Sequence, residues 1–201
     1  MQRKTIIILS VVGGILFLLF SILSWATGTY NSLVGLDEGV NQSWAQVQNQ
    51  YQRRLDLIPN LVSTVKGYAE HESSVFEKVA EARSSVGKLQ VTPEILNNAE
   101  TFKRFQQAQG ELSSALSRLL AVAENYPQLK ANENFLQLQS QLEGTENRIA
   151  VERMKFNEVV QSYNVKIRRV PASMIAGMMG FQQKQYFQAD AGAEKAPKVQ
   201  F

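Results

Sequence analysis

The chain has 201 residues, a formal net charge of +3 and no cysteine. The lack of cysteine excludes disulfides, thiol catalysis and cysteine metal sites. The basic residues are scattered along the chain and no basic face stands out, which argues against a nucleic-acid-binding protein. About 145 residues remain without the apolar N-terminal stretch and the polar tail, which is enough for one domain with a core.

An uncharged run of 20 residues, 6–25, opens the chain with the sequence IIILSVVGGILFLLFSILSW. A helix of this length is about 30 Å long and matches the hydrocarbon core of a bilayer. We therefore predict a membrane anchor over residues 1–28, with Ile6, Ile15, Phe17 and Trp25 among the lipid-facing side chains. A cleaved signal peptide is the alternative, because Ser24-Trp25-Ala26 resembles a cleavage site, but its apolar region would be unusually long.

Basic residues flank this run on its N-terminal side. Arg3 and Lys4 precede it, whereas residues 26–52 contain no Lys or Arg and carry Asp37 and Glu38. Since basic flanks stay in the cytoplasm, we expect the N-terminus inside and the following domain outside, with the lipid bilayer as the first partner.

Apolar residues spaced three and four apart continue after the anchor and predict helices. One stripe runs from Leu33 to Ile58, and a second runs from Val62 to Val79. Pro59 lies between them. The constant phase of the stripe favours a kink there, whereas matched helix lengths and the bias against helix before proline favour a turn. We predict a turn at Pro59, with separate helices on either side.

The third helix is predicted to start at Thr92-Pro93-Glu94, which offers a hydroxyl cap, a proline for the first turn and an acid for the positive end of the dipole. Asn132 is the predicted cap of the fourth helix, which Pro171 ends. The stripe of the third helix consists of Phe102, Phe105, Gln109, Leu112, Leu116, Leu119 and Ala123.

The predicted fold class is therefore all-α: an N-terminal transmembrane helix followed by an antiparallel, up-down four-helix bundle with long helices over residues 29–170. Four polar residues interrupt the stripes, and they form either a buried network that fixes the register or a wet edge. They are Glu72, Gln109, Thr145 and Glu152.

Several stretches resemble the LemA family of bacterial membrane proteins. They are YNSLV at 30–34, QVQNQYQRRLDLIPNLVSTVKGYAEHE at 46–72, Ala82-Arg83, SYNVKIRRVPASMIAGMMGFQQKQYF at 162–187 and the terminal APKVQF. The resemblance implies a bacterial inner (plasma) membrane protein with an N-terminal span and a helical bundle. The family has no established biochemical function and no assigned catalytic residues, so the resemblance implies no site.

Four motifs of known enzyme classes are absent from the sequence. The single histidine, His71, lacks the second histidine that a zincin helix carries four residues on, where Val75 stands. The paired Glu-x-x-His motifs of di-iron bundles, a glycine-rich phosphate loop and a nucleophile elbow are also missing. We predict no catalytic residue, no metal and no cofactor.

Two clusters are candidate contact sites. Arg53 and Arg54 either bind an acidic group of a partner or hold a helix end. Arg168 and Arg169 precede an apolar segment, 171–189, which either meets lipid or a partner or caps the core. The segment's contact residues are predicted to be Met178, Met179 and Phe181. Residues 190–201 are small, polar and charged, and are predicted to be disordered.

The expected function is that of a non-enzymatic, membrane-anchored scaffold or adaptor that binds an unidentified protein partner, with homo-oligomers as a further option. One alternative is an enzyme or metal-dependent activity formed only in an oligomer. Another is a structural protein that forms a lattice in the membrane.

Overall fold

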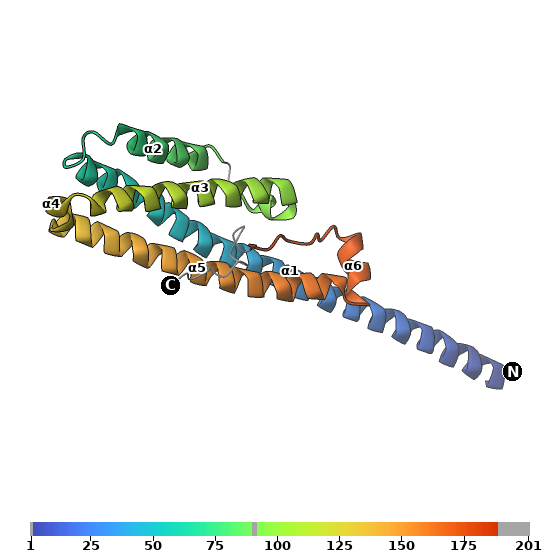
Figure 1. Ribbon diagram of the computed structural model, residues 1–201. Helices are drawn as coiled ribbons and strands as arrows, with labels where there is room; N and C mark the ends of the chain where they lie inside the picture. Colours follow the sequence, from blue (N-terminus) through green and yellow to red (C-terminus); the bar gives the residue numbers. More distant parts are fainter. Residues whose placement is uncertain (1, 90–91, 189–201) are drawn as a thin grey trace, which may run out of the picture.

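The computed structural model describes residues 2–89 and 92–188. Every regular element in these ranges is a helix, which confirms the all-α class and the long apolar helix at the N-terminus (Figure 1). In chain order the elements are α1 (Gln2–Lys66), α2 (Ser73–Gly87), the 3-10 helix η1 (Pro93–Asn97), α3 (Ala99–Glu124), α4 (Pro127–Lys130), α5 (Glu133–Arg168) and α6 (Ala172–Met178).

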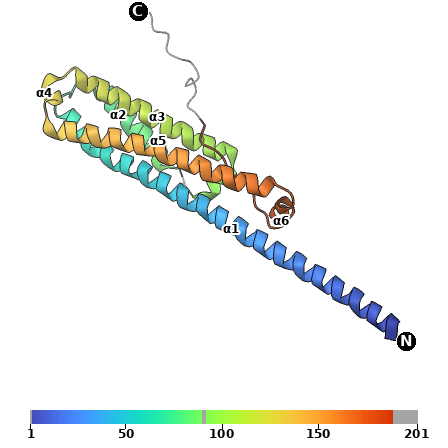
Figure 2. The ribbon, with the colours of Figure 1, turned by 90° about the horizontal axis from the view of Figure 1, so that it is seen from below.

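Four of these helices form an up-down bundle, as the sequence predicts. α1 enters the bundle, α2 returns beside it, α3 runs away again and α5 comes back along α1 (Figures 1 and 2). The short α4 lies in the turn between α3 and α5. The N-terminal part of α1 projects from one end of the bundle, here called the anchor-proximal end, and α6 lies at this same end.

The helices pack as two pairs. α5 lies closely along α1, and α2 packs on α3. Large side chains fill the space between the pairs, so two apolar clusters form the core. The aromatic core, at the anchor-proximal end, includes Trp44, Tyr51, Phe102, Phe105, Phe156, Tyr163 and Phe187. The aliphatic core, at the other end, includes Ile58, Leu61, Val65, Val79, Leu112, Leu116, Leu119 and Leu142.

The predicted turn at Pro59 is wrong, because α1 continues through this residue to Lys66. Ile58, Leu61 and Val65 are all buried in the aliphatic core, so the stripe remains on one face across the proline. The hydrogen bond that proline cannot donate falls on the exposed side of the helix, where water can replace it. The chain turns at residues 67–72 instead, and the helices are therefore unequal in length.

The predicted start of α3 is also wrong, by six residues. Thr92-Pro93-Glu94 begins η1, which buries Ile95 and Leu96 in the aromatic core. Asn98 then caps α3, and its side-chain oxygen accepts hydrogen bonds from the backbone N–H groups of the second and third residues that follow, each at 3.0 Å. The predicted cap at Asn132 is confirmed, since its side chain accepts a hydrogen bond from the Phe135 N–H at 3.0 Å.

Candidate functional site

The apolar N-terminal stretch of α1 stands clear of the bundle. By length and composition it is one helix that could cross a membrane, and none of its most apolar part is buried inside the molecule. The predicted anchor residues all lie in it with exposed side chains: Ile6, Ile15, Phe17 and Trp25. The helix passes Gly28 without interruption and reaches the core at Leu33, so the apolar stretch and the bundle share one continuous helix.

The segment after α5 forms a cap on the anchor-proximal end of the bundle. In α6 the buried side chains are Ala172 and Ala176, one turn apart, and Ile175 also packs on the aromatic core. The opposite side of the cap is apolar and exposed, and it consists of Val170, Met174, Met178 and Met179. The segment therefore covers the core with one face and presents methionines with the other.

Phe181 lies on the covering face, and its side chain is half-buried. It packs against the aromatic core, and its ring centroid lies 6.0 Å from that of Tyr30 on α1. Phe181 therefore differs from Met178 and Met179: its side chain is half-buried against the core, whereas the two methionines are exposed. Contact of these three residues with lipid or a partner stays a prediction.

Residues 181–188 follow as an extended strap that two asparagines hold against α5. The Asn164 amide donates to the Lys184 carbonyl and accepts from the Lys184 N–H, both at 2.9 Å. Asn157 does the same for Phe187, at 3.0 and 2.9 Å. Seven residues of helix rise about 10 Å, which three residues of extended chain also span, so the spacings match.

An ion pair between the buried Lys184 and the half-buried Asp37 fixes the strap to α1. The Lys184 Nζ lies 2.9 Å from a carboxylate oxygen of Asp37 and 5.6 Å from the centre of the Tyr163 ring. The Tyr163 hydroxyl donates to the Gln182 carbonyl at 3.0 Å. Burial, followed by the nearby charge of Asp37, raises the pKa of Tyr163 to about 12, so this hydroxyl keeps its proton at physiological pH.

Arg168 and Arg169 lie beside the cap, at and just after the end of α5. Both side chains are exposed, and neither forms an ion pair with a carboxylate in the described part of the chain. Their positive charge is therefore available at the end of the bundle from which the apolar part of α1 projects.

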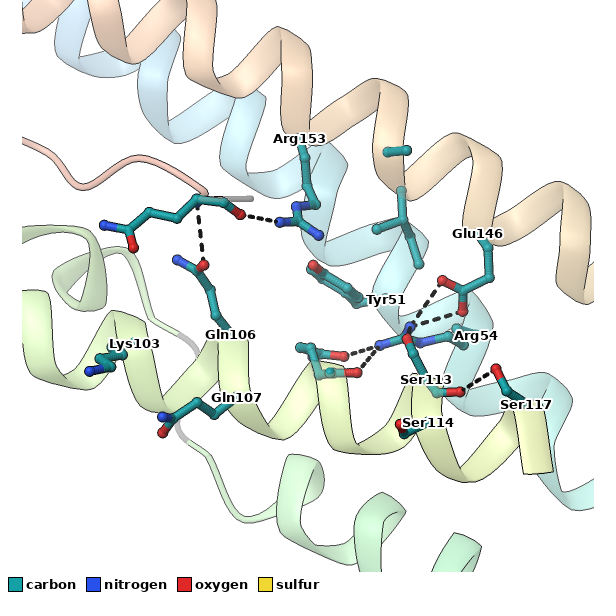
Figure 3. Close-up of a pocket in the computed structure, with 15 residues that line it drawn as sticks. Tyr51, Arg54, Lys103, Gln106, Gln107, Ser113, Ser114, Ser117, Glu146 and Arg153 are labelled. Carbon is teal, nitrogen blue, oxygen red and sulfur yellow. Dashed lines mark hydrogen bonds and ion pairs between the residues drawn. The ribbon is translucent and has the colours of Figure 1, made fainter. Parts of the chain in front are cut away.

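Arg53 and Arg54 lie in the middle of α1 rather than at a helix end, which corrects the predicted setting of both. The Arg53 side chain is exposed, whereas Arg54 is 1% exposed and lies between the aromatic and aliphatic cores. Its guanidinium contacts the Gln109 side chain, the Ser113 hydroxyl at 2.7 Å and the Glu146 carboxylate at 2.8 Å (Figure 3). The charge of Arg54 is therefore paired inside the bundle, and its contacts link α1, α3 and α5.

This polar layer forms the floor of an open groove of about 760 Å³ between α3 and α5 (Figure 3). Gln188 closes one end of the groove, since its carbonyl accepts a hydrogen bond from Arg153 at 3.0 Å.

The polar residues that interrupt the apolar stripes differ in their contacts. Gln109 joins the buried network, Thr145 bonds to the Gln141 carbonyl of its own helix, and Glu152 pairs with Lys155 near the surface.

Sequence reasoning missed Arg54 as a buried residue and Asn164 as a clamp, although both positions carried a signal. Val47, Tyr51, Arg54 and Ile58 follow steps of four, three and four, so Arg54 is in phase with the buried stripe. Asn164 is next to Tyr163 on the buried side of α5. A polar residue in phase with an apolar stripe indicates a buried hydrogen-bond partner, and here that partner comes from a distant segment.

The described residues contain no group of three or more His, Asp or Glu side chains placed to hold a metal ion. His71 lies in the exposed turn between α1 and α2.

A model of the LemA family matches residues 43–201. The chain is similar to magnetosome protein MamQ 1 of Paramagnetospirillum magneticum, at 28% identity over 181 residues, covering 79% of this chain and 64% of that protein. Magnetosome protein MamQ of Magnetospirillum gryphiswaldense is 28% identical over 174 residues with the same shares. Protein LemA of Metamycoplasma hominis is 22% identical over 179 residues, covering 86% of this chain and 78% of that protein. The chain thus spans 64% of the length of the MamQ proteins that it matches.

Proposed function

The chain belongs to the LemA family, and on that basis we propose that it is a non-enzymatic scaffold or adaptor anchored in the bacterial inner membrane by the N-terminal part of α1. In this arrangement Arg3 and Lys4 hold the N-terminus in the cytoplasm, and the bundle lies outside the cytoplasm, where it binds a protein partner.

One observation carries the proposal: a single helix runs from the apolar stretch into the bundle core, and the methionine cap lies at the same end of the bundle. Tyr30, which contacts the cap through Phe181, lies five residues beyond Trp25, or about 7.5 Å along the helix. The polar headgroup layer is about 5–7 Å thick on each side of a bilayer. These lengths support a cap at the membrane surface, where exposed methionines and arginines suit the apolar and anionic parts of lipid.

Orientation is tested by fusing a compartment-sensitive reporter after Phe201 in intact cells. The proposal expects reporter activity outside the cytoplasm, because the domain follows a span whose basic flank stays inside. Activity in the cytoplasm would overturn the proposed placement of the bundle.

Membrane contact by the cap is tested with spin labels on the full chain in lipid nanodiscs. The chain has no cysteine, so Met178→Cys and Met154→Cys each give one labelling position. Both native side chains are exposed, but residue 154 lies 14 residues before the end of α5, about 21 Å away. The label at 178 should be accessible to oxygen dissolved in lipid, and the label at 154 to a water-soluble relaxation agent. If both labels were accessible to the water-soluble agent, the cap would not touch the bilayer.

A further inference from the structure

A shallow pocket of about 490 Å³ opens beside the cap, between the end of α5, α6, the start of the strap and the end of η1. We propose that this pocket binds the phosphate of an anionic phospholipid headgroup. The proposal rests on the membrane placement argued above and adds to it a defined site with one principal residue, Arg168.

The chemistry of the pocket suits a phosphate. Arg168 supplies its positive charge, and among the described residues no Asp or Glu lines it. Asn97, Gln182 and Gln183 add exposed side-chain amides that form no hydrogen bond to other described residues, and Ser173 adds a hydroxyl. A guanidinium with neighbouring neutral donors is a typical setting for a phosphate, whereas a cation would find no anionic ligand.

The shape of the pocket leaves room for the group. Gly177 and Ala176 line it from α6, and a Cβ atom built on Gly177 would meet no atom within 4 Å. Ile167 and Phe181 add apolar surface beside the polar groups. A phospholipid offers the matching pair of surfaces, since its charged phosphate is joined to a glycerol ester and its acyl chains. Free phosphate would leave the apolar part uncovered.

The pocket is formed before any ligand arrives. The strap that makes one wall is fixed by the Tyr163 hydroxyl at the Gln182 carbonyl and by the Asn164 clamp at Lys184. Lys184 itself is paired with Asp37, so it does not compete for the phosphate. A preformed wall reduces the ordering cost of binding.

The test compares two adjacent arginines in the full chain held in detergent micelles. Both Arg168 and Arg169 are exposed, but Arg168 lines the pocket and Arg169 does not. Native mass spectrometry would measure the affinity for phosphatidylglycerol and for neutral phosphatidylcholine. Arg168→Gln should weaken phosphatidylglycerol binding about fivefold, as expected for one basic residue at an anionic lipid, and Arg169→Gln should change it less than twofold. Phosphatidylcholine carries the same phosphate together with a choline cation, so it should bind more weakly and the loss with Arg168→Gln should be smaller.

A second variant fills the space without changing the charge. Gly177→Leu should also weaken phosphatidylglycerol binding, because residue 177 lines the pocket and a larger side chain there would reduce its volume without meeting another atom at its Cβ. Helical content measured by circular dichroism serves as the folding control for all three variants. Equal losses for the two arginine variants, or no loss with Gly177→Leu, would overturn the pocket.

Two further experiments are needed. One distinguishes a lipid phosphate from a free phosphate compound, and the other distinguishes failure of the proposed anchor from failure of the proposed pocket. Glycerol phosphate added in solution should compete poorly; competition at the affinity of the lipid would assign the pocket to a free phosphate compound and overturn the headgroup assignment. Extraction of the wild-type chain from cell membranes by alkaline carbonate would overturn the anchor and the headgroup site together. A chain that resists extraction but shows no difference between Arg168→Gln and Arg169→Gln would overturn the pocket alone.

Discussion

The two cores of the bundle are built differently. In the aromatic core, the Trp44 ring contacts Phe102, Phe105, Phe156 and Phe187, with centroids 5.4 to 6.0 Å apart. These rings come from α1, α3, α5 and the strap, so one cluster joins four segments. The aliphatic core consists mainly of Leu, Val, Ile and Ala from α1, α2, α3 and α5. The layer around Arg54 separates the two cores.

This difference shows where the molecule needs a fixed geometry. Aromatic rings bury large areas with few rotatable bonds and favour specific mutual orientations, so they hold irregular segments in place. The aromatic core holds a strap and a cap, neither of which could stand alone. The aliphatic core holds regular helices, for which periodic aliphatic side chains are sufficient. The end facing the proposed membrane surface is therefore the more specifically built one.

The largest expected effect comes from removing the ring that the aromatic core shares. Trp44→Ala should lower the free energy of unfolding by about 3–5 kcal/mol, because it leaves a large cavity among four segments. Leu119→Ala in the aliphatic core should cost less, about 2–3 kcal/mol, since neighbouring aliphatic side chains can relax into the space. Denaturant unfolding of the full chain in micelles, followed by circular dichroism, measures both. A larger loss for Leu119→Ala would contradict the comparison.

The boundary between the cores should show coupling across the bundle. Glu146→Gln should cost about 3 kcal/mol, the lower end for a broken buried pair, because the Glu146 side chain is 37% exposed while Arg54 is buried. In a double-mutant cycle with Arg54→Met, the two costs should fall short of additivity by about 1–2 kcal/mol. Arg53→Met, on the exposed side of the same helix, is the control and should change stability by no more than about 0.5 kcal/mol. Fully additive costs would show that the pair does not act as a unit.

The smallest effect is a loss of stability at alkaline pH that is specific to the aromatic core. The pKa of Tyr163 is raised to about 12 in the fold, from its ordinary value of 10.0. A group with a raised folded pKa contributes fully below its unfolded pKa and loses that contribution as the pH rises through the folded one. Stability should therefore fall by about 2 kcal/mol between pH 10 and 12, because the ionised hydroxyl would be buried and close to the Asp37 carboxylate.

Thermal unfolding of the full chain across this pH range measures the effect. Tyr163→Phe should remove the alkaline component, whereas Tyr126→Phe, which alters a tyrosine packed on the aliphatic core, should retain it. An unchanged alkaline loss in Tyr163→Phe would place the titrating group elsewhere.

The regular parts of this fold could be predicted from periodicity. All seven stripe residues assigned to the third helix are buried in α3, because a helix that packs on one side repeats its environment every three or four residues. The constant phase of the stripe across Pro59 also correctly indicated that the helix does not turn there. The expectation of matched lengths overrode it, although nothing in the packing of α2 on α3 requires α2 to be as long as α1.

The irregular parts could not be predicted in this way. The strap is held by side chains of α5 that are 20 to 30 residues distant in sequence, and an extended segment paired with Asn157 and Asn164 has no periodicity of its own. The role of the cap could not be predicted either. The sequence analysis left two alternatives for residues 171–189: contact with lipid or a partner, or a cap on the core. One short helix covers the core on one side and is exposed on the other, so the two options were not exclusive.

The unbroken length of α1 determines how far a tilt of this helix would move the far end of the bundle. From Trp25 to Lys66 the helix extends about 60 Å, and because it passes Gly28 and Pro59 without a break, no hinge separates its foot from its far end. Membrane-spanning helices tilt by about 20° on average. In the proposed arrangement, a change of tilt of that size would sweep the turn beyond Lys66 sideways by about 20 Å. Bilayer thickness affects the tilt of a spanning helix. It would thereby set the position at which the far end of the bundle meets other molecules.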